Sequence, residues 1–80
     1  NVSAAYFSTV FKRETGKTFV QYLTDLRMEK AVKLLLSTNE KTYMIARKVG
    51  YADPNYFSYV FKKQFGMSPS KYKDSREAAQ

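Results

Sequence analysis

Apolar residues recur every three or four positions along most of the chain, and polar residues fill the positions between them. This period is typical of amphipathic α-helices, and no stretch shows the sustained alternation expected of a β-strand. The longest example covers about residues 19–36, where the apolar stripe is formed by Phe19, Tyr22, Leu23, Leu26, Ala31, Leu34 and Leu35. The pattern predicts an all-α fold with one long helix near the middle of the chain.

Glycines and hydroxyl residues mark several of the expected helix ends. Gly16, Gly50 and Gly66 stand where a residue in the left-handed conformation would stop a helix. Thr18 and Gln21 have the spacing of a capping box at the start of the long helix. These signals divide the chain into short helical segments on both sides of the long one.

Two prolines mark further helix starts. Asp53-Pro54 and Ser68-Pro69 each place a capping residue before a proline at the first helical position. The complete set of expected helices, besides the long one, runs from Ser3 to about Thr15, over 42–49 with Thr42 as its cap, over 54–65, and over 69–76.

The chain contains an internal repeat. Residues 6–16 read YFSTVFKRETG and residues 56–66 read YFSYVFKKQFG, so seven of eleven positions are identical. On a helical wheel most shared letters form an inner, apolar side: Phe7, Val10 and Phe11 in the first copy, and Phe57, Val60 and Phe61 in the second. Tyr22 and Tyr72 occupy the same place after each copy, and we expect both in the core.

The outer side of each copy is polar and basic. A short helix, a tight turn and the helix over 54–65 predict a helix-turn-helix unit. The outer positions are Asn55, Ser58, Tyr59 and Lys62 with Lys63 at the edge, and Ala5, Ser8, Thr9 and Lys12 with Arg13 at the edge. Amide and hydroxyl groups can hydrogen-bond to base edges, and cationic groups can contact phosphates. The outer side therefore has the chemistry of a helix that reads the major groove.

Composition supports a polyanionic partner. Fourteen Lys and Arg stand against seven Asp and Glu, for a net charge of +7, which favours nucleic acid or an anionic membrane surface. There is no Cys and no His, so the commonest metal ligands and the commonest general base are missing. We expect no catalytic site, no metal and no cofactor. The apolar runs are also too short to cross a membrane.

The phrases FKRETGKTFVQYLTDLRMEKAVKLL and IARKVGYADPNYFSYVFKKQFGMSPSKYK resemble the DNA-binding domain of the AraC/XylS family of bacterial transcription regulators, over about residues 3–73. The resemblance implies two homeodomain-like helix-turn-helix units joined by a long helix. One DNA-binding domain, 1–80, would then comprise the remainder of the first unit (1–17), a linker helix (18–36) and the second unit with a C-terminal helix (42–76). The second phrase is most similar to the branch in which this domain ends a two-component response regulator.

The first unit lacks the scaffold helix that the resemblance implies, because that helix would have to precede Asn1. We therefore expect an N-terminally truncated fragment, with residues 1–16 more mobile than residues 42–72. Signal input and dimerisation are expected in upstream domains.

The resemblance also implies a set of DNA contacts. Base-reading candidates are Ala5, Ser8, Thr9, Pro54, Asn55, Ser58 and Tyr59, all but Pro54 also found from the wheel; phosphate-contact candidates are Lys12, Arg13, Lys62 and Lys63. Each has an ordinary alternative. Asn55 could cap its helix, Tyr59 could be a surface aromatic, short hydroxyls are common on helices, and about half of the cations could be solvated surface.

Other charged residues are expected to be structural. Arg27 and the i,i+4 pair of Glu29 and Lys33 would stabilise the long helix, and Asp25 and Asp74 would lie on the surface.

The leading hypothesis is sequence-specific binding of double-stranded DNA by a cytoplasmic, nucleoid-associated transcription regulator. One alternative is a helical protein-interaction module, for example for RNA polymerase, with only non-specific DNA affinity. A binder of anionic membranes would need a basic helix with an exposed apolar face, and an enzyme would need a catalytic constellation that the sequence does not offer.

Overall fold

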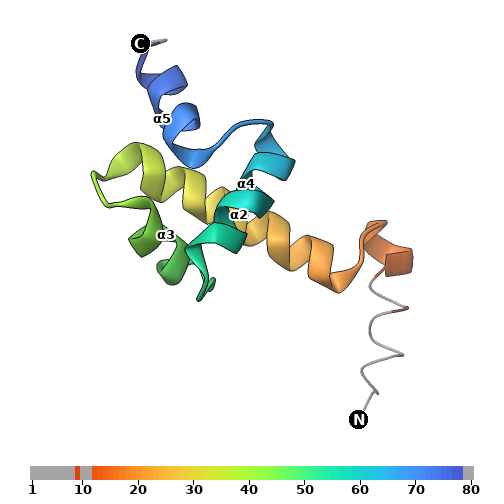
Figure 1. Ribbon diagram of the computed structural model, residues 1–80. Coiled ribbons are helices and arrows are strands. Elements are labelled where there is room, and N and C mark those ends of the chain that lie inside the picture. The colour runs from red at the N-terminus through yellow and green to blue at the C-terminus, as the bar shows by residue number, and fades with distance from the viewer. Residues whose placement is uncertain (1–8, 10–11, 79–80) are drawn as a thin grey trace.

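Three helices gather around a fourth, longer one in the computed structural model, which describes residue 9 and residues 12–78 (Figure 1). The helices are α2 (Phe19–Ser37), α3 (Thr42–Lys48), α4 (Pro54–Phe65) and α5 (Pro69–Ala78). Helix α2 runs across the middle of the molecule, and α3 and α5 each pack against both α2 and α4. Thr9 and residues 12–15 are also helical, and the described part of the chain contains no strand. The expected all-α fold is confirmed.

The hydrophobic core lies between the C-terminal half of α2 and the other three helices. Its largest fully buried side chains are Met28 of α2, Ile45 of α3, and Phe57 and Phe61 of α4. Tyr72 of α5 meets Phe61 edge to face, with ring centres 5.5 Å apart at 86°. On the inner side of the second repeat copy, Phe57 and Phe61 are therefore buried as the pattern predicts, and Val60 is partly buried against the core.

Both copies of the repeat end in the same way. Gly16 and Gly66 adopt φ angles of 77° and 80°. Each donates its N–H to a carbonyl four residues earlier at 2.7 Å, Gly16 to Lys12 and Gly66 to Lys62. A left-handed residue with this bond closes a helix at low energetic cost only if it is glycine.

The predicted helix starts are also largely confirmed. The Gln21 N–H donates to the Thr18 hydroxyl oxygen and the Thr18 N–H donates to the Gln21 side-chain oxygen, both at 3.0 Å, so the capping box is complete. Asp53 accepts the N–H of Asn55 at 2.9 Å, with Pro54 as the first residue of α4.

Helix α3 differs from the prediction at both ends. Lys41, not Thr42, takes the N-cap position, and its side chain makes no capping bond. The main-chain carbonyl of Lys41 accepts the N–H groups of Met44 and Ile45 at 3.0 and 3.1 Å, so the first turn closes one residue earlier than the threonine suggested. Val49 follows the helix as its C-cap.

The expected core position of Tyr22 is wrong, whereas that of Tyr72 is confirmed. Tyr72 packs against Phe61 and Phe65, but Tyr22 is 40% exposed. In the sequence, Thr15 stands where the second copy has Phe65, so the two copies differ at this neighbouring position.

The apolar stripe of α2 is only half covered. Ala31 and Leu35 are buried, while Phe19 and Leu26 near the N-terminal end are more than two-fifths exposed. Met28, which the stripe omitted, is fully buried. Periodicity identified the helix, but it did not say which part of its apolar side is buried.

Some predictions fall on residues outside the described part. These are the Ser3 cap, the inner positions Phe7, Val10 and Phe11, the outer positions Ala5 and Ser8, and the comparison of mobility between residues 1–16 and 42–72. None of the helices in the described residues has the length and apolar character needed to span a membrane.

Candidate nucleic-acid interface

The helix-turn-helix unit is built by α3, a tight turn and α4. Ile45 and Ala46 of α3 and Val49 in the turn are buried together with Phe57 and Phe61 of α4. This shared core fixes the inner side of α4. The outer side of the helix must then face away from the core.

The turn itself is held from α2. Gly50 has φ 105°, and a Cβ at this position would stand 3.3 Å from the guanidinium carbon of Arg27. The same guanidinium lies 5.3 Å from the centre of the Tyr51 ring, within the range of a cation–π contact. The prediction that Arg27 is structural is refined, because it supports the turn of the helix-turn-helix unit across from its own helix.

The predicted outer residues of α4 lie on the surface. Pro54, Asn55 and Tyr59 are exposed and Ser58 is half-buried. Asp53, not the Asn55 side chain, caps the helix, through the Asn55 main-chain N–H. The structure gives the Asn55 amide group no hydrogen bond within the described residues, which leaves its donor and acceptor available to a ligand.

Tyr59 belongs to an aromatic row on the same helix. Its ring stacks on that of Tyr56 at 6.3 Å and 28°, and Tyr56 in turn lies 5.9 Å from the buried Tyr51. The Lys63 ammonium is 6.0 Å from the centre of the Tyr59 ring. Tyr59 is 61% exposed, yet these neighbours restrict where its hydroxyl can reach. Tyr56 was not among the outer positions that the helical wheel selected.

The basic candidates are exposed in both copies. Lys62 and Lys63 are exposed in the last turn of α4, and Lys12 and Arg13 are exposed in the first copy. Thr9 is the one base-reading candidate of the first copy that the structure describes, and it is exposed. Exposed cations beside hydrogen-bonding groups form a surface suited to a nucleic-acid backbone.

A groove separates the N-terminal half of α2 from α4. It has a volume of about 610 Å³ and is lined by Val20, Gln21 and Thr24 on one side and by Tyr56, Tyr59 and Lys63 on the other. The outer edge of α4, including the predicted contact residues Tyr59 and Lys63, therefore opens into a space shared with the linker helix.

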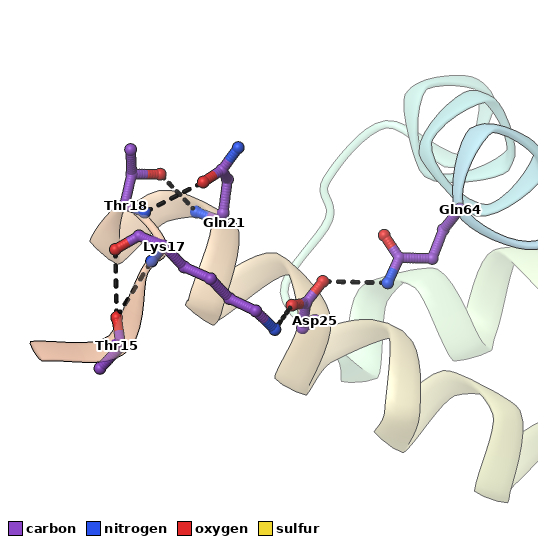
Figure 2. Close-up of polar contacts among 6 residues, drawn as sticks. All are labelled: Thr15, Lys17, Thr18, Gln21, Asp25 and Gln64. Atoms are coloured by element: carbon purple, nitrogen blue, oxygen red, sulfur yellow. Dashed lines mark hydrogen bonds and ion pairs between the residues drawn. The ribbon is translucent and has the colours of Figure 1, made fainter. Parts of the chain in front are cut away.

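Asp25 bridges this groove, which sequence reasoning missed (Figure 2). Its Oδ2 accepts a hydrogen bond from the Lys17 ammonium group at 2.5 Å, and its Oδ1 accepts one from the Gln64 side-chain amide nitrogen at 2.9 Å. The expectation of a plain surface carboxylate is corrected, because Asp25 joins three segments. The contacts lie 8 and 39 residues apart in the chain, so no local pattern could have signalled them.

The bridge perturbs both ionisable groups. The hydrogen bond from Lys17, then that from Gln64, holds the pKa of Asp25 below its ordinary value. The hydrogen bond and charge of Asp25 raise the pKa of Lys17. Both groups are therefore charged at neutral pH, and the bridge is complete there.

The ion pair expected along α2 does not form. Among the described residues, ion pairs join Lys17 to Asp25 and Lys48 to Glu40, and none joins Glu29 to Lys33. Exposed i,i+4 pairs gain little, so the two side chains have no strong reason to lose their freedom. The described residues also contain no group of three carboxylate, His or Cys side chains that could hold a metal ion.

Comparison with known proteins gives this geometry a context. Residues 1–75 match the family described as "Helix-turn-helix domain". The chain is 45% identical over 64 residues to the HTH-type transcriptional activator RhaR of Mannheimia succiniciproducens, which covers 80% of this chain and 23% of that protein. The chain thus spans less than a quarter of this curated relative, which is a transcription regulator rather than an enzyme.

Two solved structures are similar over almost all of the chain. The C-terminal domain of AraT, a response regulator from Geobacillus stearothermophilus, is 48% identical with a TM-score of 0.91, covering 94% of this chain and 62% of that one. The DNA-binding domain of the global transcriptional factor AdpA, in complex with a target DNA, is 26% identical with a TM-score of 0.93. The match covers 99% of this chain and 71% of the AdpA chain. With its helix-turn-helix unit and long α2, this chain belongs to the AraC/XylS-type family of helix-turn-helix DNA-binding domains.

Proposed function

We propose that the chain binds specific double-stranded DNA as the reading domain of a bacterial transcription regulator. The observation that carries the proposal is the outer side of α4. Asn55 and Tyr59 are exposed there beside Lys62 and Lys63, on a helix whose other side is fixed by the buried Phe57 and Phe61. A rigid helix with base-reading and phosphate-neutralising groups on one side fits the major groove.

The two copies would read successive segments of one site. We assign base reading to Ala5, Ser8 and Thr9 in residues 1–17 and to Pro54, Asn55, Ser58 and Tyr59 in the unit over 42–76, with phosphate contacts from Lys12, Arg13, Lys62 and Lys63. Helix α2 has 19 residues and is therefore about 28 Å long. That length suits readers about one DNA turn, ~34 Å, apart. Because the outer letters of the copies differ, the site would be asymmetric.

The relatives suggest a setting for this domain. A cytoplasmic, nucleoid-associated protein fits the proposed binding of chromosomal DNA. Membership of the response-regulator branch is supported by the likeness to AraT, which is such a protein. Dimerisation would reside in domains beyond residues 1–80, and contact with RNA polymerase would be an added role of the helical surface.

The test is binding by the intact natural protein that carries this sequence. Selection from a random duplex library yields a preferred site, and its affinity is then compared with that of a scrambled duplex at several salt concentrations. We expect both affinities to fall steeply with salt and a gap of at least about 10³-fold to remain between them. Equal affinities for the two duplexes would instead support the alternative of a protein-interaction module with non-specific DNA affinity.

A further inference from the structure

The carboxylate of Asp25 connects the ends of the two reading helices. Lys17 donates a hydrogen bond to the Oδ2 of Asp25, and it directly follows Gly16, where the helix of the first copy ends. Gln64, on its Oδ1, lies in the last turn of α4. Asp25 itself belongs to α2, so one side chain ties both copies to the helix that separates them (Figure 2).

The repeat indicates that this bridge is not needed for folding. Positions 17 and 25 correspond to Met67 and Ser75 in the second copy, and neither can take part in an ion pair. The second unit nevertheless has a complete core and the same glycine closure. The Lys17–Asp25 pair therefore lies between the two copies and is not part of the structure that the copies have in common.

The polar bridge also acts where the apolar packing is thin. Helix α4 is packed chiefly on α3 and α5, and the groove lies between α4 and the N-terminal half of α2. Val20 and Leu26 on that half of α2 are largely exposed. Within residues 12–78, α2 and α4 therefore share little apolar packing across the groove, which makes a directional contact there more influential on orientation.

We propose that Asp25 is a positioning residue that sets which spacing between two DNA half-sites the protein accepts; the proposal rests on the function proposed above. One added base pair moves a half-site by about 3.4 Å and turns it by about 35°. While Asp25 holds both Lys17 and Gln64, the two copies resist a change in their relative orientation, so a wrong spacing must be accommodated by deformation of the DNA. Without the Asp25 contacts, the orientation of the two copies can adjust to the shifted half-site instead.

The experiment removes the bridge and measures spacing preference. The intact protein binds duplexes that carry its two selected half-sites at the selected spacing and with one or two base pairs inserted or deleted. We expect the unmodified protein to prefer its selected spacing by about tenfold or more, and Asp25→Ala to reduce that ratio to about threefold or less. Affinity for each isolated half-site should stay nearly unchanged, which a loss of folding would not allow.

Matched variants separate the bridge from simple charge. Asp74→Ala also removes one exposed carboxylate, but Asp74 lies on α5 and forms no ion pair within the described residues. It should raise affinity for all duplexes slightly and leave the spacing ratio intact. Lys17→Ala and Gln64→Ala each remove one arm, and together they should reproduce Asp25→Ala. Asp25→Glu, which keeps the carboxylate, should restore part of the preference.

The outcomes distinguish this proposal from the one on which it rests. If the unmodified protein does not discriminate its selected site from scrambled DNA, the proposed function fails. If it does discriminate but has no spacing preference, or if Asp25→Ala keeps that preference, the positioning role is wrong. An equal loss of affinity for both isolated half-sites would also overturn it, because the role of Asp25 would then be in folding.

Discussion

The guanidinium of Arg27 lies 5.3 Å from the centre of the Tyr51 ring, and a Cβ added to the neighbouring Gly50 would stand 3.3 Å from its central carbon. A residue of α2 thus supports the turn that sets the orientation of α4. The turn can be so tight because Gly50 adopts φ 105°, a conformation that side chains with a Cβ rarely take.

Replacement of Gly50 by alanine should destabilise the domain for two reasons. The new Cβ would strain the backbone and would push against Arg27 at 3.3 Å. We expect a loss of about 2–3 kcal/mol in the free energy of unfolding, measured with urea. Gly66→Ala is the control, because its φ is also positive but its Cβ would meet open space. Gly66→Ala should lower the free energy of unfolding by only about 1–2 kcal/mol. Equal losses in the two variants would show that the Arg27 side chain moves away from the new Cβ at no cost.

The two methionines Met28 and Met44 should respond very differently to truncation. Met28 is fully buried in the core, whereas Met44 on α3 is 36% exposed. Met28→Ala should lower the free energy of unfolding by about 2–5 kcal/mol, because it leaves a cavity among large side chains. Met44→Ala should change it by less than about 1 kcal/mol. The free energies of unfolding of both variants, measured by heat or urea, test this difference. A loss at Met28 no larger than that at Met44 would mean that Met28 does not belong to the core.

Asn55 and Lys62 should affect DNA binding in different ways. Asn55→Ala should relax specificity at one or two base pairs at a cost of about 1–3 kcal/mol there. Lys62→Ala should weaken all duplexes alike and reduce the salt slope by about one. The measurement is binding to the selected duplex and to single-base variants of it. A uniform loss from Asn55→Ala would mean that its amide does not read a base.

The Lys17–Asp25 pair predicts a defined pH window for its contribution to stability. Because the folded pKa of Asp25 is lowered from 3.8, its contribution is present above that value and is lost as the pH falls through the folded pKa. Because the folded pKa of Lys17 is raised from 10.5, its contribution is present below that value and is lost as the pH rises through the folded pKa. The effect is small, since both side chains are partly exposed.

Unfolding of the unmodified protein and of Asp25→Asn across pH checks this window. The difference between them should be constant near neutral pH and vanish in strong acid, where a protonated carboxyl resembles the amide. Asp74→Asn is the matched control at neutral pH, because Asp74 forms no ion pair within the described residues and its replacement should leave the free energy of unfolding nearly unchanged. A difference that persisted below the folded pKa of Asp25 would mean that the substitution acts through packing.

Local features of the fold were predictable because their chemistry is local. Gly16 and Gly66, the Thr18–Gln21 capping box and Asp53-Pro54 each act within a few residues, so spacing alone identifies them. Burial was less predictable. Tyr22 repeats the position of Tyr72 but is 40% exposed, and Met28 became a core residue through partners on other helices.

The candidate interface was predictable only in part, for the same reason. A helical wheel finds the outer side of α4, because exposure there follows from burial of Phe57 and Phe61. It cannot find the Asp25–Gln64 contact, which joins positions 39 residues apart. Polar contacts between distant segments leave no periodic trace in a sequence.

The matching closures at Gly16 and Gly66 have a consequence for how this domain can diverge. Each copy of the repeat is terminated by its own glycine and main-chain bond, which do not involve the side chains on its outer side. Solvent-facing positions in one copy can therefore change while the stop, the inner side and the other copy stay as they are. Under the function proposed above, such a chain would acquire a new operator half by half, and grafting the outer residues of one copy onto the other would be a direct route to engineered regulators.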